Sequence, residues 1–401
     1  MKKVAFAEIN ASNGFYVLLL LLGSVVAVGL GAAYFMEHNG HEVTGMNNQI
    51  VWGMPHVFAV FLIVAASGAL NVASIASVFG KSVYKPLAPL SGLLAITLLA
   101  GGLAVLVLDL GRPDRLIVAM TNYNFKSIFA WNIFLYTGFF AIVAVYLWMM
   151  MERRFNKYSH NVGLVAFVWR LLLTTGTGSI FGFLVARQAY DAAIMAPLFI
   201  VSSFAFGLAM YILVLVSAFQ MTDREFGQGI AQRLRSLLGV FIGSVLLLTL
   251  IYHITNLYAT EHHGIEAFIL RDGGIYTHLF WFGQILLGSI LPLIILFNKS
   301  LQKSVGSLVF SAALVVIGGF IQLYVIIIGG QAFPIDLFPG YEVTSSFYDG
   351  VVASYTPSLP EILLGFGGVA LALTLTTVGV KVLRFLPVSL ADKDVDPHHK
   401  A

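Results

Sequence analysis

The 401-residue sequence contains no cysteine and few charged residues. Without thiolates, the chain has no ligands for a cysteine-bound iron–sulfur cluster, no attachment point for c-type haem and no catalytic thiol. Charged side chains make up 10% of the residues, whereas soluble domains contain about 25%. The composition therefore excludes an ordinary soluble protein. If electrons pass through this chain, the metal centres belong to partner proteins.

Long apolar runs recur along the sequence and predict an all-α, polytopic membrane protein. Each run is long enough to cross a hydrocarbon core of about 30 Å as a helix. The strands of a barrel would instead alternate over about ten residues. We expect ten membrane-spanning helices, at about residues 15–36, 56–79, 87–108, 129–151, 162–186, 196–220, 236–258, 277–297, 305–328 and 361–386. The first run is too long for a cleaved signal peptide, so we interpret it as an uncleaved span.

Lysine and arginine fall almost entirely on alternate connections between these runs. With the N-terminus inside, most of the 22 basic residues lie on inner segments, at Lys2, Lys3, Lys81, Lys85, Arg153, Arg154, Lys157, Arg224, Arg233, Arg235, Lys299, Lys303, Lys381, Arg384, Lys393 and Lys400. Basic residues in short loops orient helices toward the cytoplasm. We therefore predict a cytoplasmic (inner) membrane protein with both termini in the cytoplasm. Its partner is the lipid bilayer, and we expect no nucleic acid.

A faint internal repeat divides the spans into two parallel four-helix bundles. Trp131 stands at the start of the fourth predicted span, and Trp281 stands at the start of the eighth. Four spans return the chain to its starting side, so spans 2–5 (about 56–186) and spans 6–9 (about 196–328) would have the same orientation. The first and last spans would flank them in one membrane domain, residues 1–386. Tryptophan at a helix start is also ordinary interfacial anchoring.

Two segments outside the spans differ from the short inner connections. Residues 329–360 form the longest outer loop, with three acidic residues, no lysine or arginine, and many prolines, glycines and aromatics. Loops of this length often dock a partner, and a cap packed on the helix ends is the equally open alternative. Residues 387–401 mix charges without an apolar period. We expect them to form a disordered cytoplasmic tail.

Histidines gather at the outer helix ends. Seven of the ten lie there, at His38, His41, His56, His253, His262, His263 and His278. His56 directly follows Pro55, and proline favours the first turn of a helix. We expect His56 to open the second span at the depth where a lipid-soluble quinone headgroup resides, as a hydrogen-bond donor and proton relay. A solvated histidine at a helix end is the alternative interpretation.

The most specific stretch of the sequence is Leu-Asp-Leu-Gly-Arg-Pro-Asp-Arg at residues 108–115. Asp109 lies at the outer end of the third span, and Arg112 can pair locally with Asp109 or Asp114. One interpretation is a structural clamp at a helix exit. The other is a pocket wall whose carboxylate and guanidinium hydrogen-bond a polar headgroup.

Two further polar sets lie at the outer edge of the membrane. Asn132 and Tyr136 are four residues apart and share one helix face. We expect them at the same membrane depth as His56 and Asp109. His253 and His278 lie near the outer ends of adjacent spans, with Gln284 below them. This second set would form another polar pocket or, less plausibly, supply axial ligands to a b-type haem.

Arg170 is the one charged residue well inside a span, and intramembrane charges are functional suspects. Asn71 lies at similar depth with Ser67 and Ser74, and Thr174 follows Arg170 at helical spacing. Asn71, Arg170 and Thr174 are therefore candidates for a proton path. No aspartate or glutamate lies at this depth, so we favour snorkelling of Arg170 toward the inner face.

The sequence resembles the polysulfide reductase membrane-subunit family, the NrfD-like (PsrC-like) quinone-reactive proteins, over nearly all its spans. The resemblance rests on Gly-Met-Asn-Asn-Gln at 45–49, Trp-Gly-Met-Pro at 52–55, the stretch at 108–115 and Ser127–Tyr136. The ten-span length and the absence of cysteine are similar to the DsrP-type subunits of sulfur-metabolism electron-transfer complexes. The resemblance implies a membrane subunit without haem or iron–sulfur cluster that binds menaquinone or ubiquinone near the outer face.

The resemblance also implies site residues and partners. The family's headgroup pocket maps onto His56, Asp109, Arg112, Asn132 and Tyr136. Electrons would be exchanged with a periplasmic ferredoxin-like iron–sulfur subunit, beside a multihaem c-type cytochrome and further membrane and cytoplasmic Dsr-type subunits. The protein would be the quinone-reactive subunit of an oxidoreductase complex rather than an enzyme alone, with no metal site of its own. A secondary transporter of a small anion and a structural anchor for periplasmic redox partners are the alternatives.

Overall fold

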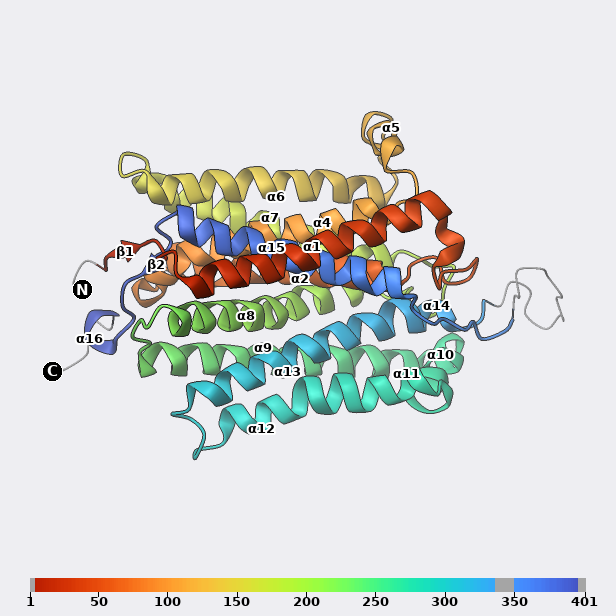
Figure 1. Cartoon of the computed structure of the whole chain (residues 1–401). Coiled ribbons are helices and arrows are strands. Elements are labelled where there is room, and N and C mark those ends of the chain that lie inside the picture. The colour runs from red at the N-terminus through yellow and green to blue at the C-terminus, as the bar shows by residue number, and fades with distance from the viewer. Residues whose placement is uncertain (1–3, 336–349, 396–401) are drawn as a thin grey trace.

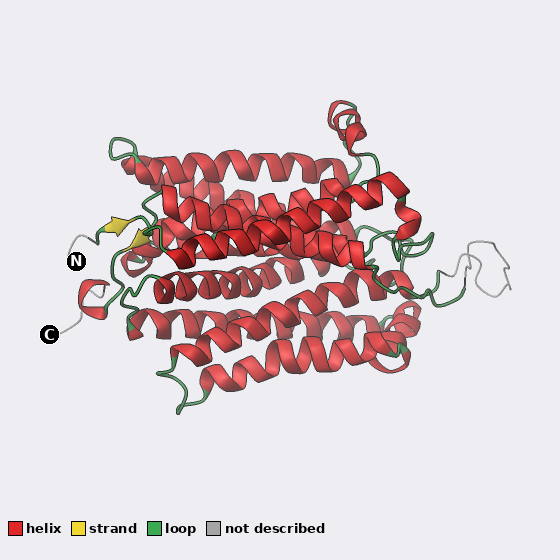
Figure 2. Ribbon diagram, in the orientation of Figure 1, coloured by secondary structure: helices red, strands yellow, loops and turns green. Residues whose placement is uncertain are grey.

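The computed structural model describes residues 4–335 and 350–395. The centre of the predicted outer docking loop and the last residues of the predicted tail lie outside these ranges. Within the described ranges, ten helices are long and apolar enough to cross a membrane, which confirms the all-α prediction and each predicted run. The helices lie roughly side by side, and the short strands lie at one end (Figures 1 and 2).

Several of the ten spans consist of consecutive helical segments. In chain order they are α1 (Asn13–Asn39); α2 (Met54–Ala69) with α3 (Asn71–Ser77); η2 (Ser82–Leu87) with α4 (Ala88–Leu108); α6 (Ile128–Met151); η4 (Asn156–Tyr158) with α7 (Ser159–Gly182); α8 (Met195–Met221); α9 (Gln228–Tyr258); α11 (Ile275–His278) with η7 (Leu279–Ile290) and α12 (Leu291–Phe297); α13 (Val305–Tyr324) with η8 (Val325–Gly329) and α14 (Gly330–Ala332); and α15 (Leu359–Val382). The connections hold η1 (His41–Val43), η3 (Pro113–Arg115), α5 (Leu116–Thr121), η5 (Thr260–His262), α10 (His263–Ala267), η6 (Phe268–Asp272), α16 (Asp392–Val395) and the strands β1 (Phe6–Ala7) and β2 (Leu386–Pro387). The segments η6, η7 and η8 are π-helical.

The first and the last described residues lie at the same end of the molecule, with β1, β2 and α16, whereas α5, α10 and α14 lie at the other end (Figure 1). This arrangement agrees with an even number of spans. We call the end with α5, α10 and α14 the outer end, after the predicted orientation. Which side of the membrane each end faces stays a prediction.

The helices of spans 2–5 (the first half) and of spans 6–9 (the second half) follow the same packing order. In the first half α2 packs on α4, α4 on α6, α6 on α7, and α7 on α2. In the second half α8 packs on α9, α9 on α12, η7 on α13, and α13 on α8. Each half is thus a closed ring of four spans. This order supports the interpretation of two parallel repeats.

The two tryptophans of the predicted repeat make matching contacts. Trp131 Nε1 donates to the carbonyl of Phe125, and Trp281 Nε1 donates to the carbonyl of Leu270, each at 2.9 Å. Both indoles therefore join the outer part of a span to the connection before it. The matching contacts are a second observation in favour of duplication.

The halves meet at a crossing of α2 and α8 that is lined by glycine. A Cβ added to Gly207 would overlap the backbone of Gly68 and Ala69, and one added to Gly68 would overlap the Ser203 carbonyl. Small residues let membrane helices approach closely enough for dispersion contacts between backbones. The core of the molecule therefore lies between the first spans of the two halves.

Residues 387–395 are ordered, so the prediction of a disordered tail is wrong for this part of it. Leu390 and Val395 are buried, and α16 packs on α9. Asp392 Oδ1 accepts a hydrogen bond from the Gly229 amide at 2.8 Å, at the first turn of α9. This contact could not be predicted, because an isolated aspartate in a charged segment carries no sign of the helix end that it caps.

Arg224, between α8 and α9, joins the two ends of the chain. Its guanidinium donates to the carbonyls of Ala7, Glu8, Leu386 and Pro387 at 3.0–3.4 Å. These carbonyls belong to β1, β2 and the residue after β1, and the two strands pair antiparallel. One arginine thus fixes both terminal segments against the membrane bundle.

Candidate functional site

A cavity of about 420 Å³ lies at the outer end of the first half. Its walls come from α2, α4, α5, α6, α7 and η8, and they are mostly apolar. Ligand pockets of about 300–1,000 Å³ with a few converging polar groups are typical of small-molecule sites. The polar residues in the lining are His56, Asn132, Tyr136, Thr137 and Thr177. The structure thus brings together three of the five residues predicted to bind a headgroup.

Asp109 lies directly behind His56. Pro55 stands in the first turn of α2 and places His56 at the outer edge, while Asp109 is the residue that ends α4. His56 Nδ1 is 2.8 Å from Asp109 Oδ2, and the carboxylate side chain is 1% exposed. The approach is not aligned as a hydrogen bond, and neither carboxylate oxygen has a hydrogen-bond partner among the described residues. Such an unmet buried carboxylate favours a hydrogen-bond donor beside it.

Asn132 and Tyr136 face the cavity from α6, one helical turn apart. Asn132 Nδ2 donates to the carbonyls of Ile128 at 2.9 Å and Gly176 at 3.3 Å. Its buried Oδ1 has no partner in the described structure. Because an amide with one satisfied and one unmet end is held in a fixed orientation, Asn132 offers an acceptor to a ligand hydroxyl.

Aromatic side chains form one wall of this cavity. The ring of Trp52 stacks on His56 with centroids 6.2 Å apart and contacts Phe181 edge-on at 5.8 Å. The Trp52 backbone is held by Gln331, whose Oε1 accepts from the Trp52 amide and whose Nε2 donates to the Trp52 carbonyl, both at 3.0 Å. A planar wall beside an imidazole suits a flat ring as ligand.

Arg112 lies outside the lining of this cavity. Its guanidinium is 61% exposed and forms a two-pronged pair with Asp114, with N–O distances of 3.0 Å. The hydrogen bond from Arg112 lowers the pKa of Asp114. Gly111 makes the turn before it with a positive φ of 68°. Arg112 therefore pairs locally with Asp114, as the interpretation of this stretch as a structural clamp predicts.

Arg170 is buried between helices and does not snorkel, so this prediction was wrong. Its side chain is 1% exposed and lies between the rings of Phe167 and Phe204, 4.9 and 5.0 Å from their centroids. These two rings stabilise the cation away from water. Thr174 Oγ1 donates to the Arg170 carbonyl at 2.7 Å, and the buried Asn71 Nδ2 has no hydrogen-bond partner among the described residues. The role of Asn71, Arg170 and Thr174 as a proton path stays a prediction.

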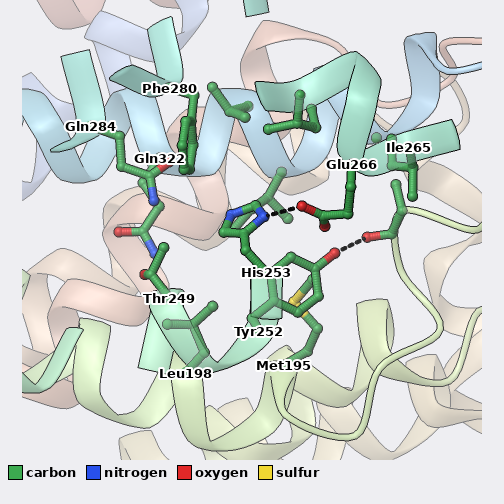
Figure 3. A pocket seen from close by; sticks show the side chains of 15 residues that line it. Met195, Leu198, Thr249, Tyr252, His253, Ile265, Glu266, Phe280, Gln284 and Gln322 are labelled. Carbon is green, nitrogen blue, oxygen red and sulfur yellow. Dashed lines mark hydrogen bonds and ion pairs between the residues drawn. The ribbon is translucent and has the colours of Figure 1, made fainter. Parts of the chain in front are cut away.

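A second, much smaller cavity of about 40 Å³ lies at the outer end of the second half (Figure 3). His253 and Gln284 line it, as expected from the sequence for a second pocket, whereas His278 is exposed and stacks on Phe282. The partner of His253 is Glu266, whose Oε2 lies 2.7 Å from His253 Nδ1. The structure thus separates the two histidines that the sequence places on adjacent spans.

Two buried glutamates were not predicted from the sequence. Glu266, 1% exposed, lies in an outer connection, where its spacing from His253 follows no helical or strand period. Glu361, 0% exposed, lies in the first turn of α15 and accepts hydrogen bonds from the amides of Gly45 and Ser358 and from the Tyr355 hydroxyl, at 2.7–2.8 Å. The Ser358–Glu361 spacing is that of a capping box and could have identified it.

Comparison with known proteins gives the family. The family model for polysulphide reductase, NrfD, matches residues 42–335, which include both cavities' histidine–carboxylate pairs. The protein belongs to the NrfD polysulphide reductase family. This NrfD-family protein is 28% identical, over 400 residues, to an Hdr-like menaquinol oxidoreductase integral membrane subunit from Archaeoglobus fulgidus, covering 98% of this sequence and 99% of that protein.

Two further relatives carry related descriptions. The menaquinone reductase integral membrane subunit of Nitratidesulfovibrio vulgaris is 24% identical over 341 residues, covering 78% of the NrfD-family sequence and 81% of that protein. The selenate reductase C subunit of Mesobacillus selenatarsenatis is 23% identical over 419 residues, covering 94% and 96%. The similarity therefore extends across most of the multi-pass membrane domain.

Proposed function

We propose that this protein is the quinone-reactive membrane subunit of a multisubunit oxidoreductase complex, and that quinone or quinol binds in the first cavity beside His56. The observation that carries the proposal is the apolar cavity of about 420 Å³ in which a histidine is backed by an unsatisfied buried carboxylate. Two relatives are named for menaquinol or menaquinone, which supports menaquinone as the ligand over ubiquinone.

The side chains of the cavity supply proton exchange. Oxidation of a quinol releases two electrons and two protons, and reduction of a quinone takes them up. His56 lines the cavity and holds Nδ1 toward Asp109, so its Nε2 is the ring nitrogen free to exchange a proton with a headgroup oxygen. Asp109 stabilises the imidazolium form that results. Asn132 Oδ1 accepts a hydroxyl hydrogen, and Tyr136, on the same helix face, is in place to bind the second oxygen.

The electrons leave or enter through partners, because this protein has no cysteine to hold an iron–sulfur cluster. A periplasmic ferredoxin-like iron–sulfur subunit docked at the outer end would be their carrier. The DsrP-type assignment, with its multihaem c-type cytochrome, further Dsr-type subunits and sulfur-metabolism setting, is the finer part of the same proposal. So is the cytoplasmic location of both termini.

Quinone binding can be measured on the full-length protein in lipid nanodiscs. Trp52 lies in the cavity wall, so a bound menaquinone analogue should quench its fluorescence, and Trp52→Phe should remove that signal. His56→Ala and Asp109→Asn should weaken binding about tenfold or more, because hydrogen bonds to charged groups contribute about 1.5–3 kcal/mol. The matched control is His38→Ala, an exposed histidine at the same end. Wild-type affinity in both cavity variants would refute the assignment.

Purification of the tagged protein from native membranes, with mass spectrometry of the proteins that accompany it, tests the partners. An iron–sulfur protein with a secretory signal is the expected companion. A protein that emerges alone, under conditions that preserve other membrane complexes, would contradict the proposed complex.

A further inference from the structure

The second cavity has the wrong size for a ring and the right size for water. An engineered cavity of about 150 Å³ accommodates benzene, whereas about 10–15 Å³ is enough for one water molecule. The second cavity measures about 40 Å³, roughly a tenth of the first. It therefore has room for a few water molecules and for no quinone headgroup.

The lining of the second cavity offers the polar partners that buried water needs. Thr249 is 4% exposed, and its Oγ1 has no hydrogen-bond partner among the described residues. Gln284, Gln322 and His253 line the same space (Figure 3). A buried water molecule requires two to four polar contacts, and an unmet hydroxyl in such a cavity is a position where water binds.

The histidine–carboxylate pair of this cavity is satisfied, unlike that of the first. Glu266 Oε2 is bonded to His253 Nδ1 at 2.7 Å, and Glu266 Oε1 accepts from Asn256 Nδ2 at 2.9 Å. The other titratable group in the lining is Tyr252, whose hydroxyl donates to the Ala189 carbonyl at 2.9 Å. No lysine or arginine is among the described lining residues. Both carboxylate oxygens of the pair therefore have partners without a ligand.

The polar lining continues toward the middle of the membrane. Gln284 and Gln322 also line a smaller cavity of about 10 Å³, together with Ser289, on the inner side of the second cavity. Gln322 Nε2 donates to Ser202 Oγ at 3.4 Å. Beyond these residues the lining becomes apolar, with Val315 and glycines. The result is a polar seam that starts at Glu266 and ends within the span of the second half.

Two π-helical segments contribute to the walls of the second cavity. Phe280 and Gln284 belong to η7, and Val325 and Ile326 belong to η8. The wider π-turn changes the carbonyl pattern, so that Ser289 Oγ donates to the Gln284 carbonyl at 3.3 Å. Departures of this kind inside long helices occur frequently at functional sites. The distortion therefore coincides with the polar lining.

We propose that His253 and Glu266, with water held at Thr249, form a proton-exchange site in the second half that is separate from the quinone cavity. A proton enters from the outer aqueous phase, is held between the Glu266 carboxylate and the His253 imidazole, and is given back to the same phase. The water at Thr249 exchanges protons with the pair, and the two glutamines of the seam orient that water. No electron moves in this step. The duplicated halves thus hold different ligands: a quinone ring in the first, water and a proton in the second.

Infrared difference spectroscopy of the full-length protein in nanodiscs tests the site directly. A pH step should give a carboxyl signal that Glu266→Gln abolishes and Glu261→Gln preserves, since Glu261 is an exposed glutamate of the same connection. Thr249→Val keeps the shape of the side chain and removes the hydroxyl, so it should slow the exchange of that signal into heavy water several-fold. An unchanged carboxyl signal in Glu266→Gln would overturn the proposal, and so would wild-type exchange in Thr249→Val.

The quinone measurement separates this proposal from the proposed function. Glu266→Gln and His253→Gln should bind the menaquinone analogue with an affinity within about twofold of wild type, a change well below the tenfold that corresponds to 1.4 kcal/mol. Loss of binding in these variants would place quinone in the second cavity and overturn the division of roles. Failure of any quinone to bind wild-type protein would refute the proposed function and leave the infrared result unaffected.

Discussion

Tyr355 and Glu361 share a hydrogen bond of 2.7 Å at the outer end, and together they hold the first turn of α2. The Met54 amide donates to the Tyr355 hydroxyl at 2.6 Å, and the Gly45 amide donates to Glu361 at 2.8 Å. Burial, and then the nearby Glu361 charge, raise the pKa of Tyr355. Its hydroxyl therefore stays protonated, so it can accept from the Met54 amide and donate to Glu361 at the same time. Met54 lies two residues before His56.

Tyr355→Phe should lower the stability of the protein and weaken quinone binding. The variant leaves the Met54 amide without its acceptor and Glu361 Oε1 without its donor, and an unsatisfied buried group costs about 1–3 kcal/mol. Thermal unfolding in nanodiscs would measure the loss. Tyr258→Phe is the control, because Tyr258 is 90% exposed at the same end and its substitution should stay within about 0.5 kcal/mol. Equal melting temperatures for the two variants would contradict this role.

Alkaline pH tests the same hydroxyl. A tyrosine whose pKa is raised in the folded state keeps its proton when the unfolded chain has lost it, so its contribution is constant below about pH 10 and falls above it. Wild-type protein should therefore lose more stability between about pH 8 and 10.5 than Tyr355→Phe does. Parallel losses in both proteins would show that Tyr355 titrates normally.

Asn132→Leu should weaken binding of the menaquinone analogue by about fivefold, because it removes one neutral hydrogen bond of about 1 kcal/mol. The volume of the side chain is nearly kept, so the helix contacts of α6 with α7 should survive. Asn122→Leu, an exposed asparagine in the connection before α6, is the control. Fluorescence quenching gives the affinity of each variant for the analogue. Equal affinities for Asn132→Leu and Asn122→Leu would show that Asn132 does not contact the ligand.

Gly207→Ala should be far more harmful than Gly243→Ala. The added methyl group would meet the backbone of Gly68 and Ala69 at the α2–α8 crossing, whereas nothing lies within 4 Å of a Cβ on Gly243. Overpacking typically costs 1–3 kcal/mol, occasionally more, and alanine at an open helix position gains up to about 1 kcal/mol. Detergent stability assays would rank the variants. A stable Gly207→Ala protein would mean that the halves meet elsewhere.

Arg224→Met should release both terminal segments while the spans stay folded. The guanidinium serves four carbonyls of these segments, and each hydrogen bond to a charged group contributes about 1.5–3 kcal/mol. Hydrogen exchange should become faster by about tenfold or more at Ala7 and Leu386. Arg233→Met, an exposed arginine nearby, should exchange like wild type. Unchanged protection in Arg224→Met would show that the pairing of β1 with β2 holds the terminal segments without Arg224.

The sequence alone could predict the spans and the membrane depth of the first cavity. Backbone polar groups in lipid must bond within their own helix, so hydropathy alone locates each span. Helix ends then set the depth of His56, Asp109 and Asn132. The sequence holds no comparable signal for which side chains contact one another between helices. The sequence places Arg112 beside Asp109 in the chain, yet the guanidinium turns to Asp114 in solvent, where both ions keep their water.

The remaining residues depend on partners from distant segments. Arg170 lacks a carboxylate at its depth, and the ring of Phe204 that covers it belongs to α8, a contact that no spacing reveals. Glu266 is buried because η5 and α10 fold the outer connection back over α9. Such groups look like solvated loop residues until the tertiary fold is known.

The pairing of α1 with α15 sets the order in which this protein can be assembled. α1 packs mainly on α15, the last span, and little of its apolar surface is otherwise covered. During synthesis the first span must therefore wait in the bilayer, surrounded by lipid, until nearly the whole protein has been inserted. A ribosome that stalls before α15 leaves an orphan helix beside an otherwise completed bundle. Membrane quality control could detect unfinished copies by that unpaired first span.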